Sequence, residues 1–67
     1  MPFRNYTQFD GEALFKMRAA YDAVVARLRI KSDDPRTSKL AAKIAALAAE
    51  GERDVEKLAK LAATDLE

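Results

Sequence analysis

The chain has 67 residues, with no cysteine and no histidine, and its 12 basic against 11 acidic side chains leave a net charge of +1. This length allows one domain at most, and so short a chain buries only about 60% of the surface that its unfolded form exposes. Without cysteine or histidine, neither disulfides nor the usual zinc or iron sites can stabilise so small a core. Self-association is the source of extra stability that remains, and we therefore favour it. The balanced charge gives no general attraction to nucleic acid or to an anionic membrane.

Residues 1–9 are an aromatic lead-in that contains Phe3, Tyr6 and Phe9. We expect these rings to fold back over a thin helical core and to enlarge it. The segment lacks the apolar stretch of a secretory leader and ends next to an acid, Asp10, so no leader is predicted. No apolar run is long enough to span a membrane, and we expect a cytoplasmic protein.

Residues 10–67 are predicted to form a single all-α domain of three helices, the first of which covers residues 10–31. Asp10 suits the N-cap position, because its carboxylate can accept hydrogen bonds from the first amides of the helix. At 100° per residue, two apolar stripes lie on nearly opposite sides of this helix. The predicted core face consists of Leu14, Met17, Tyr21, Val24, Val25 and Leu28.

The second apolar stripe of this helix consists of Phe15, Ala19, Ala23, Ala26 and Ile30. A helix with two apolar faces requires two packing partners, and the other helices of so short a chain can cover only one of them. We therefore expect the second stripe to be the interface of a homodimer.

The second and third helices are predicted over residues 35–50 and 54–66. Pro35 separates the first two helices, because proline disfavours helical geometry in the residue before it and suits the first position of a new helix. Gly51 is expected to end the second helix in a left-handed conformation, and Asp54 to cap the third. We expect a three-helix bundle in which this αα-hairpin packs against the first helix.

A helix–turn–helix of this kind is also the architecture of DNA-binding proteins that place their second helix in the major groove. Residues 54–67, however, contain four acidic and two basic side chains. The phosphate backbone repels an acidic helix. We therefore interpret the unit as a packed hairpin.

The stretch from residue 27 to residue 43 is locally basic. Its cations are Arg27, Arg29, Lys31, Arg36, Lys39 and Lys43. Only Asp33 and Asp34 oppose them, which gives a local net charge of +4. Cations at the end of the first helix suit its dipole, which is a purely structural explanation. The alternative is a basic patch that binds nucleic acid, in a regulator that acts as a dimer.

Catalytic residue patterns are missing from the sequence. The chain has no histidine or cysteine, no glycine-rich phosphate loop and no arrangement of a nucleophile with a base. We therefore expect no catalytic, cofactor-binding or metal-binding residues. The leading interpretation is a non-enzymatic protein–protein interaction module or small regulator, which forms a homodimer and binds an unidentified protein partner. The alternative is the nucleic-acid-binding regulator.

The second predicted helix and the turn that follows it carry a specific sequence pattern. Leu40, Ala41, Ile44, Leu47 and Ala48 precede the turn Gly51-Glu52-Arg53-Asp54. The arrangement resembles a feature of small uncharacterised helical proteins from alphaproteobacteria, many of which have proline where this chain has Val55. The resemblance covers most of residues 9–62. It implies a compact helical protein and no particular activity.

Overall fold

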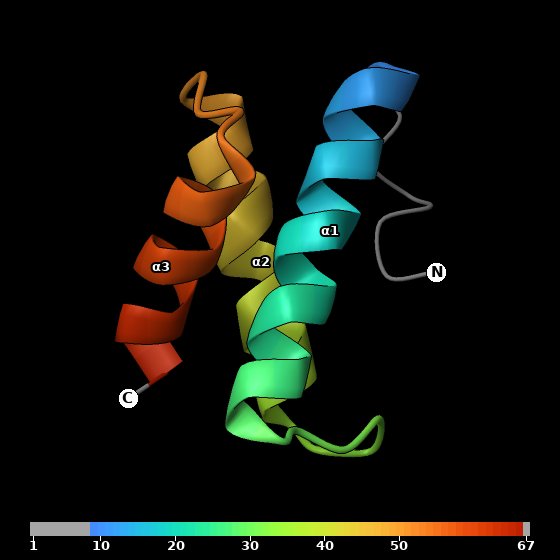
Figure 1. Ribbon diagram of the computed structural model, residues 1–67, viewed down its shortest axis with the longest axis vertical. Helices are drawn as coiled ribbons and strands as arrows, with labels where there is room; N and C mark the ends of the chain where they lie inside the picture. The colour runs from blue at the N-terminus through green and yellow to red at the C-terminus, as the bar shows by residue number, and fades with distance from the viewer. Residues whose placement is uncertain (1–8, 67) are drawn as a thin grey trace.

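The computed structural model describes residues 9–66, which form three helices: α1 (Gly11–Leu28), α2 (Arg36–Ala49) and α3 (Val55–Leu66). α1 and α3 run in the same direction, and α2, which lies behind them in this view, runs in the opposite direction (Figure 1). Each helix contacts both of the others. No strand occurs within residues 9–66, and the all-α prediction is confirmed.

Aspartate carboxylates start two of the helices, as the sequence predicts. Asp10 accepts a hydrogen bond from the amide of Ala13 at 2.7 Å. Asp54 accepts from the amides of Glu56 at 2.9 Å and Lys57 at 3.2 Å. These bonds satisfy amide donors that have no partner within the helix.

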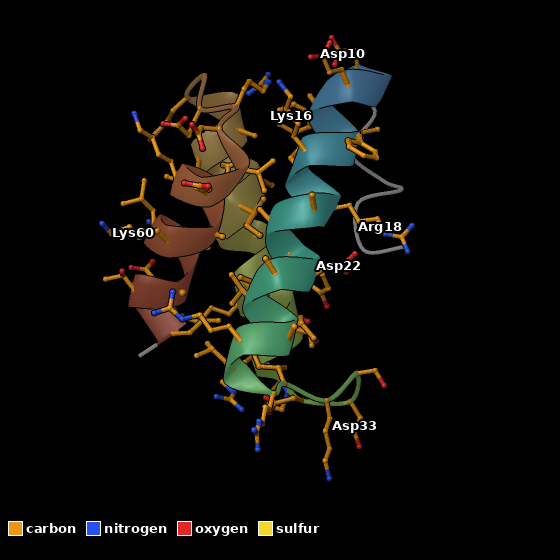
Figure 2. The ribbon with its side chains drawn as sticks, in the orientation of Figure 1. Asp10, Lys16, Arg18, Asp22, Asp33 and Lys60 are labelled. Carbon is orange, nitrogen blue, oxygen red and sulfur yellow. The ribbon has the colours of Figure 1, made fainter. Side chains whose placement is uncertain are left out.

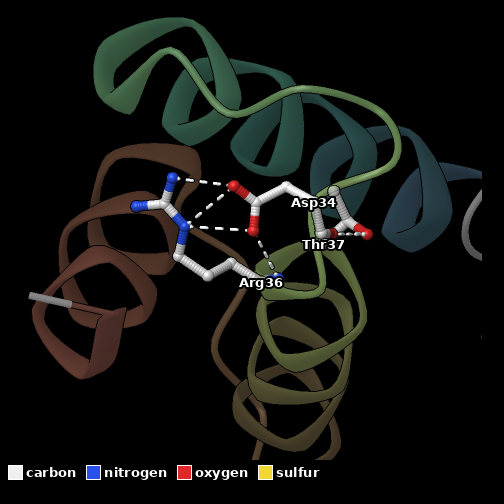
Figure 3. A network of polar contacts seen from close by, with 3 residues as sticks. All are labelled: Asp34, Arg36 and Thr37. Atoms are coloured by element: carbon white, nitrogen blue, oxygen red, sulfur yellow. Dashed lines mark hydrogen bonds and ion pairs between the residues drawn. The ribbon is translucent and has the colours of Figure 1, made fainter.

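Asp34 organises the start of α2 (Figure 3). Its carboxylate accepts from the Arg36 amide at 2.8 Å and from the Arg36 guanidinium at 2.9 and 3.2 Å. Its carbonyl oxygen accepts from the Thr37 hydroxyl at 2.8 Å. Pro35 already has helical dihedral angles, so the predicted start of this helix is wrong by at most one residue.

The end of α1 differs from the prediction. The helix stops at Leu28 instead of Lys31, because Arg29 adopts a left-handed conformation with φ 55°. The amide of Ile30 then donates to the carbonyl of Val25 at 3.0 Å, a bond typical of a Schellman-type helix end. The turn directs Ile30 into the core, where its exposed fraction is 5%.

The turn between α2 and α3 is built as predicted at both ends. Gly51 has φ +105°, a conformation that side chains with a Cβ rarely adopt. The Glu52 carboxylate accepts from the amides of Arg53 at 3.2 Å and Asp54 at 3.1 Å. The four residues 51–54 therefore close one helix and open the next.

Half of the core consists of alanine. The buried residues are Phe9, Ala13, Met17, Ala20, Val24, Ile30, Leu40, Ala41, Ile44, Ala45, Ala48, Leu58, Ala62 and Ala63. Phe9 fulfils the expectation that an aromatic ring of the lead-in covers the core, whereas Phe3 and Tyr6 lie outside the described residues. Small side chains allow the helices to approach closely, so the few large residues at their centre are completely enclosed.

The core face of α1 is rotated relative to the prediction. Met17 and Val24 are buried as expected, but the other buried positions are Ala13 and Ala20. The remaining predicted core residues are only partly buried: Leu14, Tyr21, Val25 and Leu28. The two alanines therefore lie on the side of α1 that faces the core, and the larger side chains lie to one side of them.

Candidate interaction surfaces

The outer side of α1 bears the most exposed large apolar side chain in residues 9–66. Phe15 has an exposed fraction of 74%. Together with Leu14, Ala19 and neighbouring residues of the same helix it lines a shallow hollow of about 610 Å³. We call Phe15, Ala19 and Ala26 the outer α1 face. Its exposure follows from the rotation of α1, which turns Ala13 and Ala20 toward the core.

An ion pair borders this face. The Arg18 Nε and a carboxylate oxygen of Asp22 lie 3.6 Å apart, and both side chains are more than half exposed. Both project from the side of α1 that faces away from α3 (Figure 2). A pair so exposed contributes little to stability, but it gives the apolar face a polar rim.

The structure separates the five residues expected to share a dimer interface. Phe15, Ala19 and Ala26 lie on the outer part of α1, where Phe15 and Ala26 are exposed and Ala19 is partly buried. Ala23 instead lines a groove between α1 and α3. The placement of Ile30 on this face is wrong, because the helix ends before it and its side chain is buried in the core.

The predicted basic patch is partly neutralised. Arg36 is held by Asp34, and Lys43 Nζ lies 3.2 Å from Asp65 of α3. Arg27 lines the groove between α1 and α3. The other three cations of the patch are exposed: Arg29, Lys31 and Lys39.

The Asp34 and Arg36 pair also affects protonation. The hydrogen bond from the Arg36 guanidinium, followed by that from the Arg36 amide, holds the pKa of the Asp34 carboxyl below its ordinary value. In turn, the hydrogen bond to the Asp34 carboxylate raises the pKa of Arg36. Both groups therefore stay charged near neutral pH, and the first turn of α2 presents a closed ion pair.

Two features of the surface could not be assigned from the sequence. In the sequence, Arg53 is only one residue of a turn motif. In the structure, its guanidinium lies 5.6 Å from the centre of the Phe9 ring. The groove between α1 and α3 combines residues that are more than 30 positions apart, such as Ala23 and Ala59. Helical periodicity identifies the faces of a helix and leaves open which faces meet.

Within residues 9–66, no group of three or more acidic side chains is arranged to hold a metal ion. In the same part of the chain, no helix combines the length and apolar character needed to cross a bilayer. No protein-family model matches the chain, and no curated protein or solved structure matches it. The resemblance to small alphaproteobacterial proteins stays a prediction.

Proposed function

We propose that this protein is a small non-enzymatic interaction module that acts in the cytoplasm as a homodimer, with the outer α1 face as its contact surface. The observation that carries the proposal is the 74% exposure of Phe15 beside small residues of the same helix. Burying a phenylalanine side chain contributes about 1.5–3 kcal/mol. Exposed apolar surface with a polar rim is typical of protein contact sites.

Small neighbours favour a helix as the partner of this face. Ala19 and Ala26 lie on the same side of α1 as Phe15: Ala19 follows Phe15 by four residues, and Ala26 follows Ala19 by seven. Such spacings form a continuous stripe along a helix, and small side chains allow a second helix to approach closely. A second copy of α1 supplies both the large ring and the small neighbours.

The test is the molar mass of three variants, measured by light scattering. We expect Phe15→Glu and Ala26→Glu to be monomeric, because each places a charge in the contact surface. Ala46→Glu adds the same charge at an exposed position of α2 and serves as the matched control, which we expect to remain dimeric. Dissociation by Ala46→Glu alone would place the contact on α2 and contradict the proposal.

The alternative function, nucleic-acid binding through residues 27–43, is supported by the exposure of Arg29, Lys31 and Lys39. It is weakened by the ion pairs of Arg36 and Lys43, which remove two cations from the patch. A gel-shift titration at low salt tests it. Binding that weakens steeply as salt is added would favour this alternative, since phosphate contacts release counterions.

A further inference from the structure

The groove between α1 and α3 is a second surface, distinct from the outer α1 face. It has a volume of about 480 Å³ and is open to solvent. The residues that line it are Ala23, Val24, Arg27, Glu56, Ala59, Lys60, Ala63 and Thr64. It exists because alanines occupy positions at which larger side chains would fill the space between the two helices.

The floor of the groove is apolar and its lining is positively charged. Val24 and Ala63 are buried, with exposed fractions of 1% and 4%. Two cations, Arg27 and Lys60, and one carboxylate, Glu56, line the groove. Neither cation forms an ion pair within residues 9–66. The site therefore combines an apolar surface with two cations and one carboxylate, a lining that is positive on balance.

The charges are ordered along the groove. α1 and α3 run in the same direction (Figure 1), and Glu56 lies one helical turn before Lys60. Arg27 is in the last turn of α1. The amine of Lys60 extends to the side of α3 away from α1 (Figure 2), and this flexible side chain can reach the groove by rotation.

We propose that this groove binds an amphipathic helix of a partner protein, with Asp or Glu in the first turn of that helix, running antiparallel to α1 and α3. A helix laid in an apolar groove is a common mode of protein recognition. In this direction the acidic first turn lies beside Arg27 and Lys60, and a cation in a later turn lies beside Glu56. Acidic side chains also suit the positive end of the partner's own helix dipole.

The length of the groove sets the size of the contact. The eight residue-to-residue steps from Glu56 to Thr64 span about 12 Å at a rise of 1.5 Å per residue. This length accommodates about two turns of the partner helix, with apolar residues at spacings of three and four. The small alanine side chains in the groove allow the backbone of the partner helix to approach closely. The partner helix then becomes a fourth helix around the same core.

The experiment uses a labelled, designed helical peptide as the probe, with Asp and Glu in its first turn, Leu and Ala on one face and Lys in its last turn. Its binding to the full chain is measured by fluorescence anisotropy. We expect saturable binding that is about tenfold weaker for the double variant Arg27→Glu/Lys60→Glu, because two attractive charges become repulsive. The matched control is Lys31→Glu/Lys39→Glu, which changes the net charge equally at exposed positions outside the groove.

The control should bind the probe within about twofold of the unchanged chain, since charges outside the groove act only through screened long-range attraction. Phe15→Glu should also leave binding unchanged, which separates this site from the outer α1 face. Equal affinity of both double variants for the probe, or no saturable binding to the unchanged chain, would overturn the proposal.

Discussion

The guanidinium of Arg53 lies over the ring of Phe9, 5.6 Å from its centre, and connects the segment before α1 with the turn between α2 and α3. The same guanidinium donates hydrogen bonds to the carbonyl oxygens of Ala48 and Glu52. Arg53 therefore satisfies a carbonyl at the end of α2 and also covers a buried aromatic ring.

A double-mutant cycle on this pair tests the contact. We expect Arg53→Ala to lower the free energy of unfolding by about 1–2 kcal/mol, because two hydrogen bonds from a charged group are lost. The coupling between Arg53→Ala and Phe9→Leu should be about 0.5–1 kcal/mol, the usual size of a cation–π contact. Urea unfolding of the four proteins measures both quantities. Additive effects of the two changes would show that the ring and the guanidinium do not interact.

The two glycines should respond to alanine in opposite directions. Gly51→Ala is expected to destabilise the chain by about 1–2 kcal/mol, because φ +105° strains a residue with a Cβ. Gly11 is in the first turn of α1, and a methyl group added there would meet open space. Gly11→Ala should stabilise the chain by about 0.5–1 kcal/mol. Thermal unfolding at equal protein concentration distinguishes the two, and a loss of stability in both would contradict this assignment.

Arg29 is the only non-glycine residue with positive φ in residues 9–66. Arg29→Gly should stabilise the chain by up to about 1 kcal/mol, since glycine adopts φ 55° without a steric penalty. Arg29→Ala serves as the control, because it removes the charge and keeps the strain. If the glycine and alanine variants had the same unfolding midpoint, the left-handed conformation assigned to residue 29 would be wrong.

Asp34 should determine part of the change in folding stability between neutral and acidic pH. Its pKa is lowered in the folded chain, chiefly by the hydrogen bond from the Arg36 side chain. A carboxyl whose pKa falls on folding stabilises the fold above its unfolded pKa, and this contribution is lost as the pH falls through the folded pKa. Asp34→Asn should therefore be less stable than the unchanged chain near neutral pH, and the difference should shrink in acid.

Denaturant unfolding over a series of acidic pH values measures this difference. Asp33→Asn is the matched control, because Asp33 has no hydrogen bond or ion pair within residues 9–66. We expect the control to follow the profile of the unchanged chain. A constant difference between Asp34→Asn and the unchanged chain at every pH would show that the carboxylate charge is not responsible.

The number of helices and their boundaries follow largely from local signals. Asp10, Gly51 and Asp54 act at helix ends through their own side chain or backbone conformation, and these features are visible in the sequence. The end of α1 was missed because no glycine marks it. The apolar periodicity continues to Ile30, whereas the structure buries Ile30 by turning the chain at Arg29.

The packing of α1 was harder to predict for a related reason. Hydrophobicity assigns the core face to the large residues around Leu14 and Tyr21, but these are only partly buried, whereas Ala13 and Ala20 are buried. An alanine is compatible with both a buried and an exposed position, so a helix rich in alanine has a poorly determined orientation. The same ambiguity placed Ala23 on the dimer face, although it lines the groove beside α3.

Sedimentation equilibrium across a dilution series tests the central claim, which is self-association through the outer α1 face. The chain has a mass of 7.4 kDa. We expect twice this mass at high concentration, a shift toward the monomer on dilution, and a monomer at every concentration for Phe15→Glu. A mass of 7.4 kDa for the unchanged chain throughout the series, or a dimer that Phe15→Glu leaves intact, would contradict it.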